Sequence, residues 1–308
     1  MVTRSINRIA IVGFGEVGGI FGHDFAKLGL DISVFDTLLA SKRYRRQMMS
    51  KARTSGVRAA DNLNDCLRDA ELVISAVTPS SAVDVARDAR PNLNPGQIFL
   101  DLNSVSPETK QEVASHIDRS KARFVEAAVM AGVPKPRLKV PMLLGGPHAA
   151  EMAGRLRSVG MNATAFSDQV GMASAVKMCR SVMIKGLEAL AVECLFAARQ
   201  YGAEDAVLES LSATYPSMGW KDHLPDYLIS RVAEHGRRRA AEMREVAQTL
   251  DDVGVEPTMA LAIALRQEGL VSEMSECDID LESDQPFSWR ALADAVVRAT
   301  HRRRKKIA

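Results

Sequence analysis

The chain has 308 residues, of which 46% are hydrophobic, 25% charged and 5% aromatic. This composition excludes a disordered or fibrous protein and provides enough apolar residues for about two domains. Five of the 40 Lys and Arg residues lie in the last eight positions, so residues 1–300 carry a net charge of −3. Because a nucleic-acid-binding protein is expected to be basic on its folded part, nucleic acid is not a predicted partner, and the basic end is expected to be solvated.

The four cysteines and six histidines show no metal-like spacing, which predicts reduced, mostly packed thiols and no metal site. Residues 1–15 run from a short polar segment directly into glycines, without a signal-peptide pattern. No segment approaches the roughly 18 consecutive apolar residues of a membrane span. We therefore expect a cytoplasmic protein with no membrane contact.

The first half of the chain alternates predicted strands and helices. Short apolar or β-branched runs predict strands at residues 8–12, 31–35, 71–77, 98–101, 122–129, 140–144 and 162–166. Helices are expected at residues 20–28, 82–89 and 148–157, and from Pro107 onward with Ser106 as the N-cap. Repeated alternation of this kind predicts a mostly parallel sheet with helices on both faces.

The second half contains predicted helices only. Residues 169–200 have no proline and carry apolar residues on every side, which predicts a long helix that is covered on all faces. Further helices are expected at residues 203–213, 225–252, 257–268 and 286–300. We therefore place an α/β domain at residues 1–168 and an all-helical substrate and dimerisation domain at residues 169–308. A homodimer is expected because one small helical domain does not easily cover such a helix.

A glycine motif directly follows the first predicted strand and begins the first helix. In this context the pattern G-x-G-x-x-G is typical of dinucleotide binding. Gly13 permits the tight turn, Gly15 lets the backbone approach a pyrophosphate, and Gly18 lets helix and strand pack closely. The first half is therefore predicted to be a Rossmann-type doubly wound domain. The candidate cofactor contacts in this motif are Gly13, Phe14, Gly15, Glu16, Val17 and Gly18.

Asp36 ends the second predicted strand, where a carboxylate binds the adenosine ribose hydroxyls. Its charge disfavours a ribose 2′-phosphate, so NAD is preferred over NADP. Basic residues just beyond it keep NADP open as the alternative: Lys42, Arg43, Arg45 and Arg46. Residues near the ends of the later strands complete the candidate cofactor contacts: Val77, Thr78, Pro79 and Asn103.

A dinucleotide domain followed by a long apolar helix with an early lysine resembles the β-hydroxyacid dehydrogenase and 6-phosphogluconate dehydrogenase superfamily. The resemblance covers nearly the whole chain. Segments beginning at Lys177 and Lys185 resemble a divergent branch with an uncharacterised 6-phosphogluconate-dehydrogenase-like C-terminal domain. The resemblance implies oxidation of an alcohol with a nicotinamide cofactor, Lys177 as general acid/base, and a dimer with interleaved helical domains.

The substrate motifs depart from the family's pattern. Asn103 stands where the family commonly has a substrate-binding serine, and Met130 and Ala131 replace a serine and a glycine that bind a carboxylate. The asparagine expected three residues after the lysine is Arg180. Either the substrate is bulkier or less acidic than a simple 3-hydroxy acid, or Arg180 supplies the carboxylate contact. The candidate substrate contacts are Asn103, Ser104, Met130, Ala131, Gly132, Arg180 and Ser181.

Lys177 also stands out without the resemblance. Desolvation among apolar neighbours shifts a lysine pKa toward neutrality, and a proton acceptor poised near pH 7 suits alcohol oxidation. At about 100° per residue, one stripe of the long helix carries Ser174, Lys177, Ser181, Lys185 and Glu188. We expect the two serines to orient Lys177 or bind substrate, and Lys185 to pair with Glu188. A later group is expected to form a solvated helix face, with a cap over the substrate pocket as the alternative: His235, Arg238, Arg239 and Glu242.

The sequence thus predicts an NAD(P)-dependent dehydrogenase or reductase that acts on the CH–OH group of a hydroxy acid or related alcohol. Imine reduction on the same architecture is one alternative, although such sequences commonly place an acid or tyrosine at the position of Lys177. A catalytically silent dinucleotide sensor is another, and the altered substrate motifs favour it.

Overall fold

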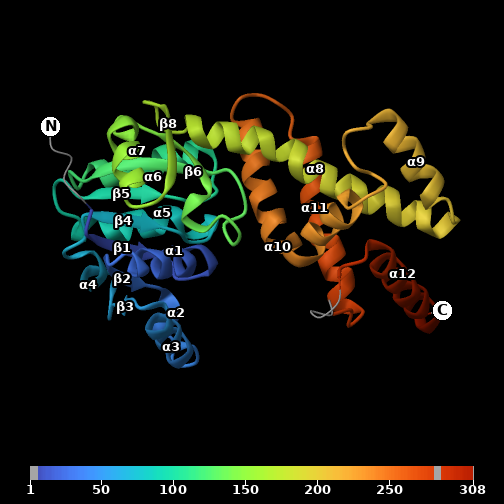
Figure 1. The fold of residues 1–308 in the computed structure, drawn as a ribbon, viewed down its shortest axis with the longest axis horizontal. Helices are drawn as coiled ribbons and strands as arrows, with labels where there is room; N and C mark the ends of the chain where they lie inside the picture. The colour runs from blue at the N-terminus through green and yellow to red at the C-terminus, as the bar shows by residue number, and fades with distance from the viewer. Residues whose placement is uncertain (1–5, 281–285, 308) are drawn as a thin grey trace. The chain divides into compact units, whose positions relative to one another are not determined.

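The computed structural model describes residues 6–280 and 286–307, with side chains described as far as residue 299. The chain divides into two compact units, Met1–Met178 and Cys179–Ala308. The boundary predicted after residue 168 precedes helix α8 (Met172–Tyr201), whereas the division between the units falls inside this helix. The elements of each unit are labelled in Figure 1.

The first unit contains an eight-stranded sheet in the order β3-β2-β1-β4-β5-β6-β7-β8. All neighbouring strands are parallel except β6 and β7. Only residues 130–140, with one short 3-10 turn, connect β6 to β7, which is too short for a helical crossover and therefore reverses the chain. The strands are β1 Arg8–Val12, β2 Asp31–Phe35, β3 Arg58–Ala59, β4 Leu72–Ser75, β5 Ile98–Asp101, β6 Arg123–Val129, β7 Pro141–Gly145 and β8 Asn162–Ser167.

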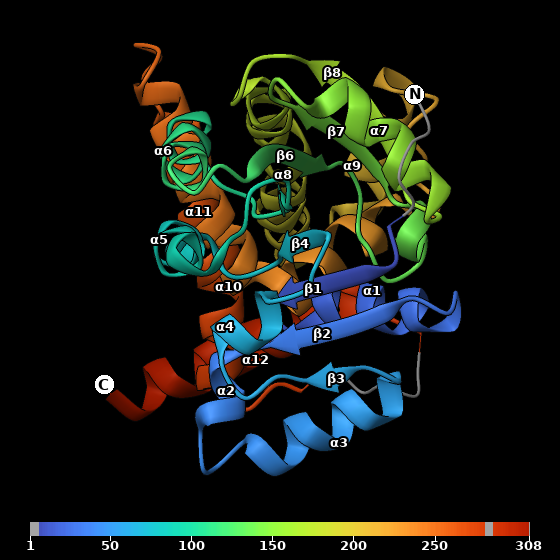
Figure 2. The ribbon, with the colours of Figure 1, turned by 90° about the vertical axis from the view of Figure 1, so that its left-hand side faces the viewer.

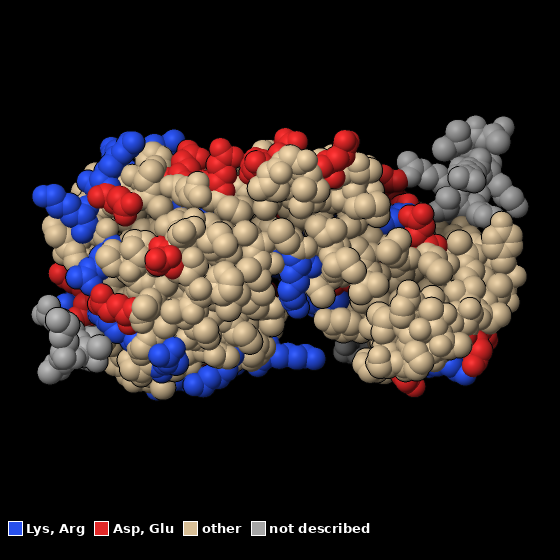
Figure 3. Space-filling model, turned by 90° about the horizontal axis from the view of Figure 1, so that it is seen from above, with Lys and Arg blue, Asp and Glu red and all other residues tan. Residues whose placement is uncertain are grey.

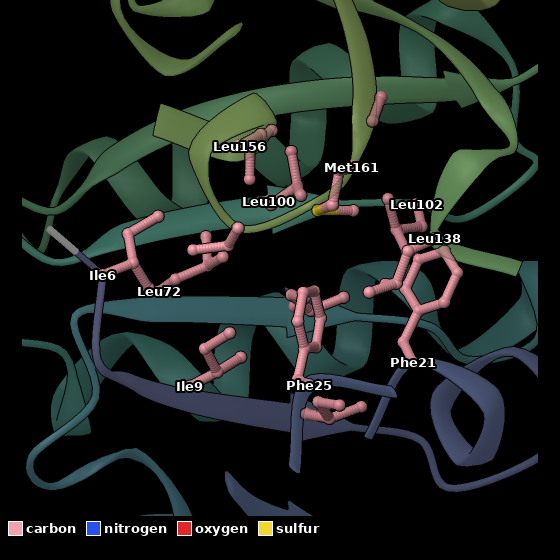
Figure 4. Close-up of a cluster of buried hydrophobic side chains, with 14 of the residues drawn as sticks. Ile6, Ile9, Phe21, Phe25, Leu72, Leu100, Leu102, Leu138, Leu156 and Met161 are labelled. Atoms are coloured by element: carbon pink, nitrogen blue, oxygen red, sulfur yellow. The ribbon is translucent and has the colours of Figure 1, made fainter. Parts of the chain in front are cut away.

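Helices cover both faces of the sheet (Figure 2) because both faces of its central strands are apolar. In β4, Leu72 and Ile74 pack into a core with α1, α3 and α7, part of which is drawn in Figure 4. Val73, between them, points to the opposite core with α4, α5 and α6. The predicted doubly wound α/β architecture is confirmed. The helices of this unit are α1 Glu16–Lys27, α2 Thr37–Ala40, α3 Arg45–Ser55, α4 Leu63–Leu67, α5 Ala82–Ala89, α6 Pro107–Asp118 and α7 Ala149–Ser158.

Two predicted element boundaries have a visible physical cause. Helix α6 begins at Pro107, and the Ser106 hydroxyl accepts a hydrogen bond from the backbone N–H of Thr109 at 3.1 Å, as a capping serine does. Helix α1 begins at Glu16, four residues before the predicted start, because the glycine loop leads straight into its first turn.

Helix α3 was not predicted, since its sequence is mostly polar and only Met48 and Ala52 are buried.

The second unit is helical, as predicted. Besides α8, its helices are α9 Glu204–Thr214, α10 Leu224–Asp251, α11 Thr258–Glu276 and α12 Trp289–Ile307. Helices α10 and α11 pack so closely that a Cβ atom at Gly236 would lie 2.3 Å from the carbonyl oxygen of Gln267. The chain by itself does not cover α8 on all faces, because Met183 is 67% exposed and Leu190 57% exposed, and the predicted cover by a second subunit stays a prediction.

Charged side chains of both signs lie on the surface (Figure 3), in agreement with the nearly equal numbers of basic and acidic residues in the sequence. On the face shown in Figure 3, acidic and basic side chains are interspersed among larger areas of other residues. None of the helices within residues 6–280 and 286–307 is long and apolar enough to cross a membrane. The backbone of the basic end continues α12, and the side chains of residues 300–308 lie outside the described part of the chain.

Candidate active site

Four neighbouring strands of the first unit end at the same edge of the sheet. Strands β1, β4, β5 and β6 lie side by side and are parallel, so the residues that follow them come together there. The chain proceeds from β1 to β2 on one side and later returns to β4 on the other. This change of direction is the point at which doubly wound sheets bind their ligands.

The three glycines of the loop after β1 have different environments. Gly13 has a φ of +93°, and a Cβ there would lie 2.4 Å from the carbonyl oxygen of Ala76, next to the end of β4. A Cβ at Gly18 would lie 2.0 Å from the carbonyl oxygen of Gly13. A Cβ at Gly15, by contrast, would meet no atom of the described residues within 4 Å. The protein's own packing therefore explains Gly13 and Gly18 but not Gly15.

Gly15 is the N-cap of α1, and its lack of a side chain leaves the first amides of this helix accessible. Helix N-terminal amides bind phosphate through N–H donors and the helix dipole. An open glycine beside such amides fits the close approach of a dinucleotide diphosphate. The side chain of Phe14 is buried in the core, and its backbone N–H and carbonyl are bonded to Asp36 and Lys51, so its predicted cofactor contact stays a prediction. Glu16 is exposed and Val17 half-buried.

Asp36 connects the end of β2 to this loop. Its Oδ2 accepts a hydrogen bond from the backbone N–H of Phe14 at 2.8 Å, and its Oδ1 accepts one from Leu38 at 2.9 Å, which caps α2. The carboxylate therefore has a structural role in addition to its predicted contact with ribose. Of the basic residues considered for a 2′-phosphate, Arg45 donates to the carbonyl of Leu39, and the guanidinium of Arg43 lies over the ring of Tyr44.

Lys51, in α3, is a basic residue that the sequence analysis missed. Its Nζ donates hydrogen bonds to the carbonyl oxygens of Phe14 at 2.6 Å and Gly15 at 2.8 Å. Burial lowers the pKa of Lys51, and the nearby Asp36 carboxylate opposes this change. No local pattern marks Lys51, because it reaches the loop only through the packing of α3 beside α1.

Asn103 bridges the ends of β4 and β5. Its Oδ1 accepts a hydrogen bond from the backbone N–H of Val77 at 2.7 Å, and its Nδ2 donates to Ser75 Oγ at 2.9 Å. The residue is buried, and both groups of its amide already have protein partners. The predicted contact with a substrate or cofactor oxygen stays a prediction and would need the second N–H of this amide. Beyond Val77, Thr78 is exposed and Pro79 half-buried.

A buried ion pair holds the end of β5 in place. Lys110 Nζ lies 2.9 Å from Asp101 Oδ2 and donates a second hydrogen bond to the carbonyl oxygen of Asp101, also at 2.9 Å. Neither side chain has exposed surface. The other carboxylate oxygen of Asp101 accepts from the backbone N–H of Asn103 at 3.0 Å. The pair therefore fixes the start of the loop that carries Asn103 and Ser104.

Lys177 contacts this loop from the beginning of α8. Its Nζ donates a hydrogen bond to the hydroxyl of Ser104, three residues after Asp101, the last residue of β5. The lysine is half-buried. Its amine therefore lies at the carboxyl edge of the sheet that also carries the glycine loop, which is the arrangement expected of an acid/base group in a nicotinamide-dependent enzyme.

Glu126, in β6, holds the first turn of α8. Its Oε1 accepts hydrogen bonds from the backbone N–H groups of Gly171 at 2.8 Å and Ala173 at 3.0 Å. Its Oε2 accepts from the hydroxyl of Ser174 at 2.9 Å. A buried carboxylate at a helix N-terminus also interacts favourably with the helix dipole. Ser174 thus serves this cap, although it was predicted to orient Lys177 or bind substrate.

The remaining candidate substrate residues have varied exposure. Met130 is half-buried and its backbone N–H donates to the carbonyl of Pro141 at 2.9 Å, continuing the pairing of β6 with β7. Ala131 and Gly132, which follow it, are exposed. In α8, Arg180 is exposed and Ser181 is buried, within the second unit.

The later part of the predicted α8 stripe belongs to a buried polar cluster of the second unit. Lys185 pairs with Glu242 at 2.9 Å, and Glu188 pairs with Arg239 at 2.7 Å and accepts from Gln267 at 3.2 Å. Burial raises the pKa of Glu188, and Arg239 opposes this change. The expected pairing of Lys185 with Glu188 is therefore wrong.

The predicted solvated face on α10 is also partly wrong. Arg238 is exposed, but Arg239 retains only 11% of its side-chain exposure because it lies against α8. Glu242 is half-buried and pairs with both Lys185 of α8 and the exposed Arg238. His235 is half-buried, and burial lowers its pKa. Sequence periodicity identified an amphipathic helix here, but not which of its polar residues face another helix.

The cysteines differ in exposure. Burial raises the pKa of Cys66 to about 12, so this thiol is unreactive. Cys179 and Cys194 are exposed, which corrects the expectation that most thiols are packed. Within the described ranges, no three His, Cys, Asp or Glu side chains are arranged to hold a metal ion.

A doubly wound sheet with a glycine loop at its switch point, followed by a helical unit, defines a dinucleotide-binding protein of the dehydrogenase type. Residues 8–165 match the family model of the NAD-binding domain of 6-phosphogluconate dehydrogenase, and the chain belongs to this family. Residues 198–270 match a domain of unknown function. The predicted family and fold class are thereby confirmed.

Several relatives resemble the chain over most of its length. A conserved hypothetical protein from Sinorhizobium meliloti 1021 has a solved structure with a TM-score of 0.74 and 34% identity, covering 96% of this chain and 98% of that one. An uncharacterised 28.5 kDa protein from Methanothermus fervidus is 31% identical over 82% of this chain and 94% of its own. The 3-hydroxyisobutyrate dehydrogenase of Pseudomonas aeruginosa is 25% identical over 69% of this chain and 71% of its own.

Proposed function

We propose that the protein is an NAD(P)-dependent dehydrogenase that acts on the hydroxyl-bearing carbon of a hydroxy acid or related alcohol, with Lys177 as general acid/base. The observation that carries the proposal is the contact between Lys177 Nζ and Ser104, at the sheet edge where the glycine loop also lies. Membership of the family and likeness to a 3-hydroxyisobutyrate dehydrogenase support the same class of reaction.

The cofactor would be held by the glycine loop and the adjoining strand ends. The amides that follow Gly15 would bind the diphosphate, and Asp36 would bind the adenosine ribose hydroxyls. Because the Asp36 carboxylate repels a 2′-phosphate, NAD is the preferred cofactor over NADP. When bound, the nicotinamide supplies a hydride acceptor for the carbinol carbon.

Lys177 would manage the proton of the same carbinol group. In oxidation, the neutral amine takes the hydroxyl proton as the carbon loses its hydride, and the substrate becomes a carbonyl compound. In the reverse direction, the ammonium returns the proton to the oxygen. Ser104 holds the amine on the loop after β5. Substrate contacts are proposed from Met130, Ala131 and Gly132 after β6, and from Arg180 and Ser181 in α8.

A two-stage experiment tests this proposal. A thermal-shift screen first compares NAD⁺ with NADP⁺, since a ligand that binds the native state raises its melting temperature. A panel of hydroxy acids, simple alcohols, ketones and imines is then followed by nicotinamide absorbance with the better nucleotide. Turnover of a hydroxy acid supports the proposal. Turnover of imines alone points to an imine reductase, and nucleotide binding without any turnover points to a sensor.

The helical unit is proposed to form a homodimer through its exposed apolar residues. Met183 and Leu190 are seven positions apart and therefore share one face of α8, while Leu265 of α11 is 70% exposed. We expect light scattering to give the mass of a dimer for the native chain and of a monomer for the double variant Met183→Lys/Leu190→Lys. Leu28→Lys, at an exposed apolar residue of the first unit, is the matched control and should leave the dimer intact. A native monomer would contradict the prediction.

Two glycines of the same loop should respond differently to alanine. Gly18→Ala forces a Cβ against backbone, so we expect a loss of about 1–3 kcal/mol in the free energy of unfolding. Gly15→Ala meets no described protein atom within 4 Å and should change stability by less than about 1 kcal/mol. Its dinucleotide affinity should nevertheless fall about tenfold or more, because the methyl group occupies the space of the approaching diphosphate. Urea denaturation and calorimetric titration measure the two effects, and unchanged affinity in Gly15→Ala would refute this assignment.

A further inference from the structure

Lys51 reaches across helix α1 to the backbone of the glycine loop. Its ammonium donates to two successive carbonyl oxygens, those of Phe14 and Gly15, at 2.6 and 2.8 Å. It also lies 4.6 Å from the centre of the Phe14 ring. Hydrogen bonds from a charged donor are stronger than neutral ones, so two of them on adjacent peptide groups restrain the loop strongly.

A second observation, independent of these bonds, concerns the path of the side chain. A Cβ at Gly19 would lie 2.9 Å from Lys51 Cε and 3.0 Å from its Nζ. Gly19 lies inside α1, where glycine is less favourable than alanine by about 1 kcal/mol. The missing side chain at position 19 therefore provides the passage through which Lys51 reaches the loop.

The two carbonyl contacts also determine where the neighbouring N–H groups point. In a planar trans peptide, C=O and N–H point in opposite directions. A carbonyl of Phe14 held toward Lys51 directs the N–H of Gly15 away from it, and the carbonyl of Gly15 does the same for the N–H of Glu16. The preceding N–H, that of Phe14, is held by Asp36. The two peptide groups on either side of Phe14 are thus oriented by charged side chains, whereas the carbonyl of Gly15 accepts from the backbone N–H of Gly19 at 3.1 Å as well as from Lys51.

We propose that Lys51 is a positioning residue that orients the N–H groups of Gly15 and Glu16 toward the diphosphate of the bound dinucleotide. This inference rests on the proposed function, since it requires a diphosphate-containing ligand at the loop. The ammonium also polarises the two peptide groups and makes their N–H groups better donors. Lys51 acts through the backbone and takes no part in hydride or proton transfer.

Two substitutions remove this arrangement in different ways. Lys51→Met keeps an unbranched stem of similar length and removes the ammonium. Gly19→Ala keeps the lysine but displaces its flexible end, while alanine favours the helix and should not lower stability. Each should weaken binding of NAD⁺ and of ADP-ribose about tenfold or more. The double variant should be no weaker than Lys51→Met, because both changes break the same contact and their effects are not additive.

Calorimetric titration measures the affinity of each variant for NAD⁺ and for ADP-ribose. The control is Lys27→Met, which replaces an exposed lysine at the end of α1. ADP-ribose carries the diphosphate but no nicotinamide. A weaker affinity of the variants for ADP-ribose would therefore assign the effect of the substitutions to the glycine loop. In steady-state assays, Lys51→Met should raise KM for the dinucleotide and leave kcat at saturation within about twofold, and Lys51→Arg should restore most of the affinity.

The outcomes separate this inference from the proposed function. Tight binding by the native protein and unchanged binding by Lys51→Met and Gly19→Ala would overturn the role of Lys51 and leave the function standing. Failure of the native protein to bind either ligand would overturn both. If Lys51→Met does not fold, Gly19→Ala decides alone, and wild-type affinity in that variant overturns the inference.

Discussion

Replacing Lys177 with methionine lowers kcat/KM for alcohol oxidation by about 10²–10⁴-fold, the range that a positioned general acid/base contributes. Ser104 holds the amine on the loop after β5, whereas the amides that would bind the diphosphate follow β1, so we expect the loss to fall on the chemical step. The affinity for NAD⁺ should therefore remain within about twofold of the native value. Steady-state kinetics and calorimetric titration measure the two quantities.

Lys177→Arg separates proton transfer from charge. An arginine keeps the positive charge but does not release its proton at accessible pH, so it should not restore turnover. The pH profile of kcat/KM should lose the limb that belongs to the amine in both variants. Lys27→Met serves again as the exposed control. Activity within about threefold of the native value in Lys177→Met would show that another group carries the proton.

Replacing Lys110 with methionine should lower the free energy of unfolding by about 3–5 kcal/mol. Lys110 and Asp101 form an ion pair without exposed surface, so removal of one partner leaves the other charge buried and uncompensated. Asp101→Asn should have a comparable effect. The double variant Lys110→Met/Asp101→Leu should recover much of the loss, because no isolated charge remains.

Loss of the Lys110–Asp101 ion pair should also disturb the candidate site. Asp101 also accepts from the backbone N–H of Asn103, so the single variants should disturb the loop that carries Ser104. Urea denaturation measures stability, and Arg87→Met is the matched control, because Arg87 pairs with Asp84 on the surface and such pairs contribute about 1 kcal/mol or less. A change below about 1 kcal/mol in Lys110→Met would contradict the buried-pair interpretation.

Much of the fold was predictable because strand and helix signals are local. The continuous apolar run of β4, the cap at Ser106 and the glycine loop each depend on residues close together in sequence. The strand at β7 was predicted but its antiparallel direction was not, because the direction depends on how the short 130–140 connection returns to the sheet. Helix α3 was missed because it buries only a narrow stripe, so its hydrophobic signal is weak.

The candidate site was predictable to a smaller degree. The glycine loop, Asp36 and Lys177 were identified from spacing and from family resemblance. Glu126 was not among the candidate residues, and its role as the cap of α8 emerged from its contacts with Gly171, Ala173 and Ser174. Lys51 had no sequence signal of its own, since its partners lie 36 and 37 residues away on the glycine loop. Lys110 had none either, since the fold of the β5–α6 connection decides that it turns back to Asp101 and is buried there.

The sequence by itself determined the dinucleotide-binding class, the order of strands and helices, and the presence of a lysine early in α8. These depend on interactions within one turn, one strand or one loop, whose geometry follows directly from the order of the residues. Only the tertiary structure decided which charged side chains are buried in pairs and which act on the glycine loop. Lys185 and Glu188 illustrate the difference, because helix spacing brings them near each other whereas packing against α10 gives each a different partner.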